Sequence, residues 1–198
     1  MPGRNDAGPG VGVRDSGFAN FCPFCPFGPF MLKKKVCLLG AFAAGKTSLV
    51  ARFVKSIFSD KYHTTVGVKI DSKSVLAGDQ EILILLWDLY GEGEEDEFQK
   101  VRMTYLNGAS GYILVVDGTR PETLQTAQTL HQRVLSQVGQ LPFVVALNKV
   151  DLSDEWELTS EDLESSQTHG WEFIYTSAKS GEGVEVLFQH LAKKMVSK

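Results

Sequence analysis

From residue 31 to its end, the chain alternates between short apolar runs and segments with the spacing of a helix. In one segment, Val68 and Ile70 alternate with the polar residues Lys69, Asp71 and Lys73, which is typical of a half-exposed edge strand. The other strand candidates are apolar throughout and so predict buried strands. They cover residues 36–39, 82–87, 112–116, 143–147 and 171–175.

Amphipathic helices are predicted between several of these strands. One follows the first strand, with Leu49, Phe53 and Ile57 on a single face. Another lies before Gly170, and Thr159 with Asp162 three residues later predicts its N-terminal cap. The last helix has the clearest apolar face, made of Val184, Leu187, Phe188, Leu191 and Met195.

This order of elements predicts an α/β fold. A turn at 77–79 joins the edge strand to the run at 82–87, so these two strands form an antiparallel hairpin. Strands separated by helices favour parallel pairing, with the helices lying on the sheet faces. We therefore expect a six-stranded, mostly parallel sheet with one antiparallel edge strand and helices on both faces, as in P-loop NTPases.

Residues 1–30 differ from the rest of the chain. They are rich in Gly and Pro, show no periodicity, and end in a stretch of Phe, Cys and Pro at 21–30. Such a composition does not form a packed core, so we expect a disordered extension, or a start assigned upstream of a true start at Met31. Cys22 and Cys25 have the spacing of half a zinc site, but no second Cys pair completes it. We expect residues 31–198 to form one domain.

Charge and cysteine usage narrow the partners and the compartment. The 198 residues have a net charge of −4, which argues against nucleic acid as the main partner. Three cysteines without framework spacing, and no signal peptide, favour a cytoplasmic location. The chain starts Met-Pro and ends without a cysteine, so we expect no intrinsic membrane anchor.

A phosphate-binding loop is the strongest chemical signal. The segment 40–47, Gly-Ala-Phe-Ala-Ala-Gly-Lys-Thr, fits G-x-x-x-x-G-K-[ST] between a predicted strand and a predicted helix. Its backbone N–H groups, including those of Ala43, Ala44 and Gly45, can surround a polyphosphate at the helix N-terminus. Lys46 would reach the β- and γ-phosphates, and the Thr47 hydroxyl would bind Mg²⁺. The motif alone does not distinguish ATP from GTP.

A second motif predicts the base. Asn148, Lys149 and Asp151 form N-K-x-D directly after a buried strand, at the edge where α/β sheets bind ligands. The Asp151 carboxylate can accept hydrogen bonds from the ring N–H and exocyclic amine of guanine, and adenine offers neither donor. Two charge-assisted bonds of roughly 1.5–3 kcal/mol each favour guanine by a factor of hundreds or more. Ser177-Ala178-Lys179 would close the other side of the base.

The motifs in this order make residues 33–196 resemble small Ras/Rab-like GTPases. They are the phosphate loop at 40–47, a threonine at 65, Trp87-Asp88-x-x-Gly91, N-K-x-D at 148–151 and S-A-K at 177–179. The residues 33–40 and the missing lipidation tail look more like prokaryotic members than eukaryotic Rabs. The resemblance implies a GTP/GDP switch with Mg²⁺ as cofactor.

The resemblance also implies roles for individual residues. Phe58 falls where the family stacks an aromatic ring on guanine, although a core phenylalanine at a helix end is the competing interpretation. Tyr62 and Thr65 match the first switch, with Thr65 on Mg²⁺ only when a γ-phosphate is present. Asp88 would hold the metal through water, and the Gly91 N–H would contact the γ-phosphate. The remaining nucleotide contacts would come from Gly40 and Ser48 of the phosphate-loop region.

Effectors and regulators would bind at residues 58–68 and 88–104. Within the second range, 92–97 is strongly acidic, which suits either a basic partner or a solvated first helical turn. These two alternatives remain open from the sequence.

Three residues depart from the family pattern, and two of them, Phe42 and Glu92, put the hydrolysis rate in doubt. Phe42 replaces a small glycine and crowds the space that an arginine finger would use, a group worth about 10³–10⁵ in rate. Glu92 replaces the usual glutamine and is repelled by the γ-phosphate, and Tyr90 is larger than the usual alanine. With Lys46, Gly91 and Glu92 as the catalytic set, we expect hydrolysis to be slow or to depend on a partner.

Two other functions compete with a hydrolysing switch. Phe42 and Glu92 are equally consistent with a GTP-binding interaction scaffold that has negligible turnover. A different P-loop enzyme, such as an ATPase or kinase, is the third candidate, and Asp151 argues against it.

Overall fold

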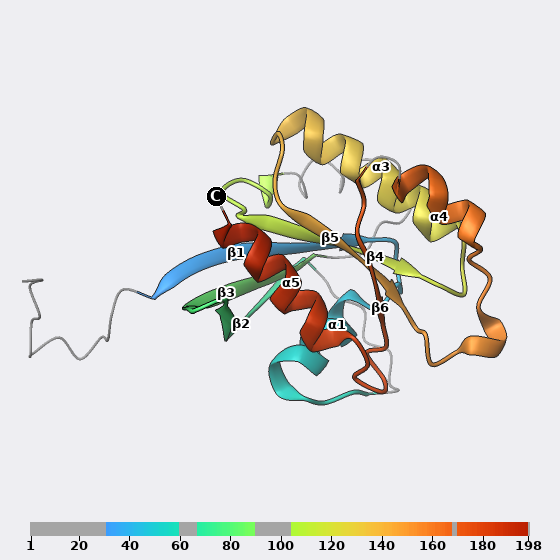
Figure 1. Ribbon diagram of the computed structural model, residues 1–198, viewed down its shortest axis with the longest axis horizontal. Helices are drawn as coiled ribbons and strands as arrows, with labels where there is room; N and C mark the ends of the chain where they lie inside the picture. The colour runs from blue at the N-terminus through green and yellow to red at the C-terminus, as the bar shows by residue number, and fades with distance from the viewer. Residues whose placement is uncertain (1–30, 60–66, 90–103, 168–169, 198) are drawn as a thin grey trace, which may run out of the picture. The chain divides into compact units, whose positions relative to one another are not determined.

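The computed structural model describes residues 31–59, 67–89, 104–167 and 170–197. They contain a six-stranded sheet in the order β2-β3-β1-β4-β5-β6, in which only the β2–β3 pair is antiparallel (Figure 1). The predicted α/β fold class is therefore confirmed. The strands are β1 (Leu32–Gly40), β2 (Val68–Ala77), β3 (Gln80–Leu89), β4 (Gly111–Asp117), β5 (Phe143–Asn148) and β6 (Phe173–Thr176).

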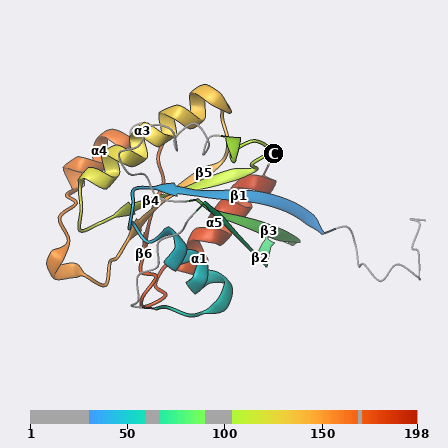
Figure 2. The ribbon, with the colours of Figure 1, turned by 180° about the vertical axis from the view of Figure 1, so that it is seen from behind.

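Helices cover both faces of the sheet, and the sequence positions their apolar faces inward. The helices are α1 (Lys46–Lys55), α3 (Glu122–Gln137), α4 (Ser160–Gln167) and α5 (Val184–Val196), with a short 3₁₀ helix η1 (Ser153–Glu155). Figures 1 and 2 show α1 and α5 on one face, and α3 and α4 on the other.

The core under α1 and α5 is built by the even-numbered residues of β1 and β3. Val36 pairs with Leu86 in the parallel register, and both side chains are fully buried. Above them, Phe53 of α1 stacks on Phe188 of α5 with ring centroids 3.8 Å apart. This contact joins the two helices that follow the first and last strands.

The opposite face has a more aromatic core. The Tyr112 hydroxyl and His131 Nδ1 lie 2.7 Å apart, within a group of rings completed by Phe143 and Trp171. Leu124, Ala127, Leu130 and Val134 of α3 pack against the same core. Burial of the apolar helix face is the main stabilising term on this side.

Two of the predicted elements need correction. Helix α1 ends at Lys55, so Ile57 lies beyond it and is 55% exposed rather than buried with Leu49 and Phe53. Strand β6 begins at Phe173 and forms the outer edge of the sheet, so it is not a buried strand and its Tyr175 is exposed. An aromatic, β-branched run fits an edge strand as well as a buried one, and periodicity cannot separate them over four residues.

The predicted cap of α4 is confirmed. The Thr159 N–H donates to Asp162 Oδ2 at 2.8 Å, and the Asp162 N–H donates to Thr159 Oγ1 at 3.3 Å. This reciprocal pair is a capping box, and the hydrogen bonds from Thr159 lower the pKa of Asp162.

Several predictions lie outside the described residues. They concern residues 1–30, Tyr62, Thr65 and the acidic segment from Gly91 to Glu97. Among the residues that the structure does describe, no helix is both long and apolar enough to cross a membrane.

Candidate nucleotide site

The candidate residues meet at the edge of the sheet where the parallel strands end. Gly40, Asp88, Asp117 and Asn148 are at or near the C-terminal ends of β1, β3, β4 and β5. Strand β1 lies between β3 and β4, because the chain passes from β1 to β2 and β3 on one side of it and then crosses to β4, β5 and β6 on the other side. Ligands bind at such a switch point because the loops diverge there and leave a crevice.

Glycines at both ends of the phosphate loop are required by its backbone. Gly40 has a φ of +148°, and a Cβ there would fall 2.3 Å from the Val115 carbonyl oxygen. Gly45 has a φ of +99°, and its Cβ would fall 2.2 Å from Asn148 Nδ2. Gly45 therefore permits the phosphate loop to lie directly against the N-K-x-D segment, which the sequence did not reveal.

Asn148 connects three segments of the site. Its Nδ2 donates to the Ala44 carbonyl oxygen at 2.9 Å, and its Oδ1 accepts from the Ala178 N–H at 3.3 Å. The side chain is buried, so these bonds are shielded from water. The phosphate loop and the S-A-K segment are thus held at one side chain.

Lys46, Thr47 and Ser48 form the first turn of α1. The Lys46 ammonium is buried and donates to the Gly40 and Ala41 carbonyl oxygens at 2.9 and 2.8 Å. No acidic residue lies in this turn. The helix therefore begins with a fixed cation and backbone N–H groups, an arrangement that favours an anion.

Asp88 provides the test of whether this site fits a metal ion. The side chain is fully buried, and neither carboxylate oxygen accepts a hydrogen bond within the described part of the chain. Burial raises the pKa of Asp88, although the Thr47 side chain and the Lys46 charge act in the opposite direction. The desolvation of this carboxylate outweighs the effects of Thr47 and Lys46, so a cation beside it would be favourable. A carboxylate next to a threonine hydroxyl fits Mg²⁺, which prefers oxygen ligands and retains waters.

The residues predicted to read the base are positioned by the loop after β6. The Ser177 hydroxyl donates to Asp151 Oδ1 at 2.5 Å and accepts from the Ser180 N–H at 2.9 Å. From α1, the Arg52 guanidinium donates to the carbonyl oxygens of Ala178, at 2.7 Å, and Lys179. The loop that carries Lys179 is consequently tied to the helix that follows the phosphate loop.

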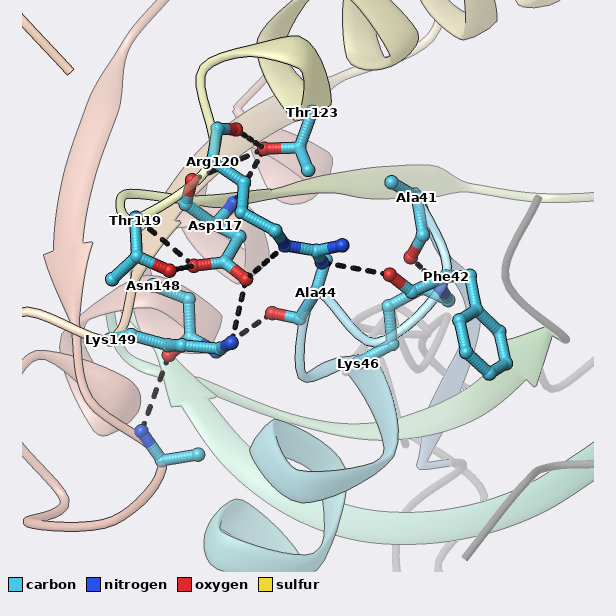
Figure 3. A network of polar contacts seen from close by, with 11 residues as sticks. Ala41, Phe42, Ala44, Lys46, Asp117, Thr119, Arg120, Thr123, Asn148 and Lys149 are labelled. Atoms are coloured by element: carbon cyan, nitrogen blue, oxygen red, sulfur yellow. Dashed lines mark hydrogen bonds and ion pairs between the residues drawn. The ribbon is translucent and has the colours of Figure 1, made fainter. Parts of the chain in front are cut away.

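A buried ion network lies between the phosphate loop and the N-K-x-D segment (Figure 3), and the sequence interpretation missed it. Asp117 is fully buried, and its Oδ2 accepts from Lys149 Nζ at 2.6 Å and from Arg120 Nε at 2.8 Å. Burial alone would raise the pKa of Asp117, but hydrogen bonds from Lys149, Thr119 and Arg120 outweigh it and lower the pKa. The signal in the sequence was an aspartate at the end of an apolar strand, at the same edge as the known motifs.

The structure brings together most, but not all, of the predicted site residues. Gly40, Ala43, Ala44, Gly45, Lys46, Thr47 and Ser48 lie in the segment from β1 to the start of α1. Phe58 is half-buried and packs against the core under α1 and α5. Its stacking on guanine therefore remains a prediction, as do the roles of Tyr62, Thr65, Gly91 and Glu92.

These features define a class of protein. A phosphate loop between a parallel strand and a helix, held by an N-K-x-D asparagine, is the nucleotide site of a P-loop α/β domain. The family model described as the Ras family matches residues 35–197. The chain therefore belongs to the Ras family of small GTPases, which are GTP-binding molecular switches.

Relatives of this chain are Ras-related Rab proteins. It is 33% identical over 165 residues to Ras-related protein Rab7 of Drosophila melanogaster, covering 80% of this chain and 78% of the relative. It is 31% identical over 164 residues to Rab-21 of Homo sapiens, covering 82% and 72%. It is 34% identical over 167 residues to Rab5 of Nicotiana tabacum, covering 83% and 82%. The predicted resemblance is confirmed, while the likeness to prokaryotic members remains a prediction.

Proposed function

We propose that the chain binds GTP and GDP with Mg²⁺, hydrolyses GTP slowly, and changes the conformation of two switch segments with the nucleotide. The observation that supports this most directly is the contact between the two motifs. Asn148 binds the phosphate loop at Ala44, and three residues later Asp151 is oriented by Ser177. A single nucleotide, with its base at Asp151 and its phosphates at Lys46, can therefore contact both motifs.

Guanine recognition would rest on Asp151. Its Oδ1 accepts from Ser177, which leaves acceptor capacity on a carboxylate for the ring N–H and the amine of guanine. The Ala178 N–H and the neighbouring backbone are fixed by Asn148 and Arg52, so this side of the pocket is formed before the base arrives. Preorganisation of this kind reduces the entropy lost on binding.

The phosphates would lie against the first turn of α1. Lys46 donates to the loop's own carbonyl groups, and we expect its ammonium to turn toward the β- and γ-phosphates when they bind. Thr47 and Asp88 would hold Mg²⁺, with Thr65 joining them in the GTP form. When bound, the ion would neutralise part of the charge on the two phosphates.

Slow hydrolysis follows from Phe42 and Glu92. The Phe42 side chain is 38% exposed at the phosphate loop, where it limits access for an arginine from a partner. Glu92 would be the group closest to the attacking water, and the negative charge of its carboxylate is repelled by the γ-phosphate. The same two residues support the second candidate, a GTP-binding scaffold with negligible turnover.

We propose a cytoplasmic location for the protein. Effectors and regulators would bind the segments 58–68 and 88–104. These segments contain Thr65 and Gly91, the residues proposed to sense the γ-phosphate. Loss of that phosphate would release both segments, which is how a partner would distinguish the two forms.

The base assignment is tested by titrating purified, nucleotide-stripped protein with GDP and ADP in the presence of Mg²⁺. We expect GDP to bind at least a hundredfold more tightly than ADP, and Asp151→Asn to remove most of this preference. Asp154→Asn is the matched control, because it makes the same change in the neighbouring 3₁₀ helix. Equal affinity for ADP, or an Asp151→Asn variant with wild-type selectivity, would refute the proposal.

The hydrolysis rate separates the two candidates. In a single-turnover assay with bound GTP, a switch enzyme produces GDP, whereas a scaffold keeps GTP through prolonged incubation. Glu92→Ala tests the role of the carboxylate, since fast cleavage that the substitution leaves unchanged contradicts it.

A further inference from the structure

Arg120 makes two contacts that belong to different parts of the site. Its Nε donates to Asp117 Oδ2 at 2.8 Å, and its Nη2 donates to the Phe42 carbonyl oxygen at 2.8 Å (Figure 3). The first acceptor is at the end of β4, and the second is inside the phosphate loop. A guanidinium is planar and rigid, so fixing one nitrogen also fixes the position of the other.

Asp117 also fixes Lys149 of the N-K-x-D segment. Lys149 Nζ lies 2.6 Å from the same Oδ2 atom, while Oδ1 accepts from the Thr119 N–H and hydroxyl at 3.1 and 2.8 Å. The backbone N–H of Asp117 in turn donates to Thr123 Oγ1 at 2.9 Å. The carboxylate is fully buried and held from several directions, so it is a rigid anchor for both cations.

The phosphate loop is thereby held at two of its carbonyl groups. Arg120 holds the Phe42 carbonyl, and Asn148 holds the Ala44 carbonyl at 2.9 Å. Ala43, between them, has a φ of +58°, a conformation that non-glycine residues adopt only when their surroundings enforce it. The two external bonds provide that constraint.

We propose that Arg120 is a positioning residue that couples the guanine-reading segment to the phosphate loop and slows nucleotide release. This inference rests on the proposed function, because it concerns the same ligand. Lys149 and Arg120 share Asp117, so movement of Lys149 away from the base weakens the hold of Asp117 on Arg120. When Arg120 no longer binds the Phe42 carbonyl, that part of the phosphate loop is free to move. The loop that surrounds the phosphates then loses its bound-state geometry, and the nucleotide leaves faster.

Arg120→Lys separates this role from a purely structural one. A lysine keeps the positive charge and can pair with Asp117, but its single ammonium group lacks the fork that spans Asp117 and Phe42. Arg120→Ala removes both contacts. Arg133→Lys makes the same chemical change in α3, away from the loop that contains Arg120, and is the matched control.

The measurement is the release rate of GDP with a fluorescent N-methylanthraniloyl group, displaced by excess GDP at fixed Mg²⁺. We expect Arg120→Lys and Arg120→Ala to release it about tenfold faster than wild type, which corresponds to about 1.4 kcal/mol, with Arg133→Lys unchanged. Circular dichroism melting of the nucleotide-stripped proteins should give the same melting temperature for Arg120→Lys and wild type.

The outcomes separate the two proposals. A wild-type protein that fails to bind GDP refutes the proposed function itself. If wild type binds GDP and Arg120→Lys releases it at the wild-type rate, only the role of Arg120 is refuted. A melting temperature for stripped Arg120→Lys as low as that of Arg120→Ala would show that the guanidinium is needed for the stability of the fold itself, and would also overturn the inference of a positioning role.

Discussion

Gly118 and Trp156 provide a sharp test of how the site's edge is packed. A Cβ added at Gly118 would fall 2.0 Å from Trp156 Cζ3 and 2.3 Å from Cε3 and Cη2. Gly118 is not among the glycines with positive φ, so alanine suits its backbone, and the conflict comes only from the indole ring. The Trp156 Nε1–H also donates to the Leu158 carbonyl oxygen at 3.0 Å, so the ring cannot move without straining or losing this bond.

The cost of Gly118→Ala can be estimated from these contacts. Overpacking contributes about 1–3 kcal/mol, and loss of the indole hydrogen bond adds about 1 kcal/mol. We therefore expect the free energy of unfolding to fall by about 2–4 kcal/mol. In a domain of this size the melting temperature should fall by roughly 2–4 °C for each kcal/mol.

A double-mutant cycle with Trp156→Leu isolates the contact. Leucine removes the ring atoms that a Cβ would meet, so Gly118→Ala should cost less than about 1 kcal/mol in that background, leaving an interaction energy of about 1–3 kcal/mol. Urea unfolding followed by circular dichroism measures all four proteins. Effects that add within about 0.5 kcal/mol would refute the assignment of the cost to the indole ring.

Two further predictions concern the buried carboxylates. Asp88→Asn should raise the free energy of unfolding of the nucleotide-free protein by about 1–2 kcal/mol, because it removes a buried charge whose desolvation outweighs the effects of Thr47 and Lys46. It should also abolish the tightening of GDP binding by Mg²⁺. A destabilised variant, or one that responds normally to Mg²⁺, contradicts this. Asp117→Asn should cost about 3 kcal/mol at pH 7, because Lys149 and Arg120 lose their counter-ion. Since the pKa of Asp117 is lowered by folding from an ordinary value of 3.8, wild type should keep this advantage above pH 5 and lose it as the pH falls below 3.8. Urea unfolding from pH 3 to 8 measures the difference in free energy of unfolding between wild type and Asp117→Asn. A difference that does not change with pH would show that the Asp117 charge is not its source.

Local patterns were sufficient for the motifs and most of the elements. The segment 40–47 is readable as a strand, a loop and a helix start from its own residues, because glycine supplies the backbone freedom and Lys46 begins the helix. The capping box at Thr159 and Asp162 is similarly local. Such features depend on residues within a few positions of one another, so the sequence alone predicts them.

Element ends and exposure were less predictable. Ile57 continues the apolar spacing of α1, yet Ser56 adopts a left-handed conformation and ends the helix before it. Tyr175 belongs to a run that resembles a buried strand, but its exposure depends on β6 being the last strand of the sheet. Strand order is a property of the whole chain, and no window of residues contains it.

The sequence by itself determined the fold class, the phosphate loop and the guanine motif of this Ras-family chain. Only the tertiary structure showed that Asn148 binds Ala44, and that Asp117 joins Lys149 to Arg120 and so to Phe42. The physical reason is separation along the chain: apart from the local Asp117–Arg120 pair, these contacts form only when parallel strands bring their C-terminal ends to one edge. Hydrogen bonds between such loops depend on ångström-scale placement, which hydrophobic patterning does not encode.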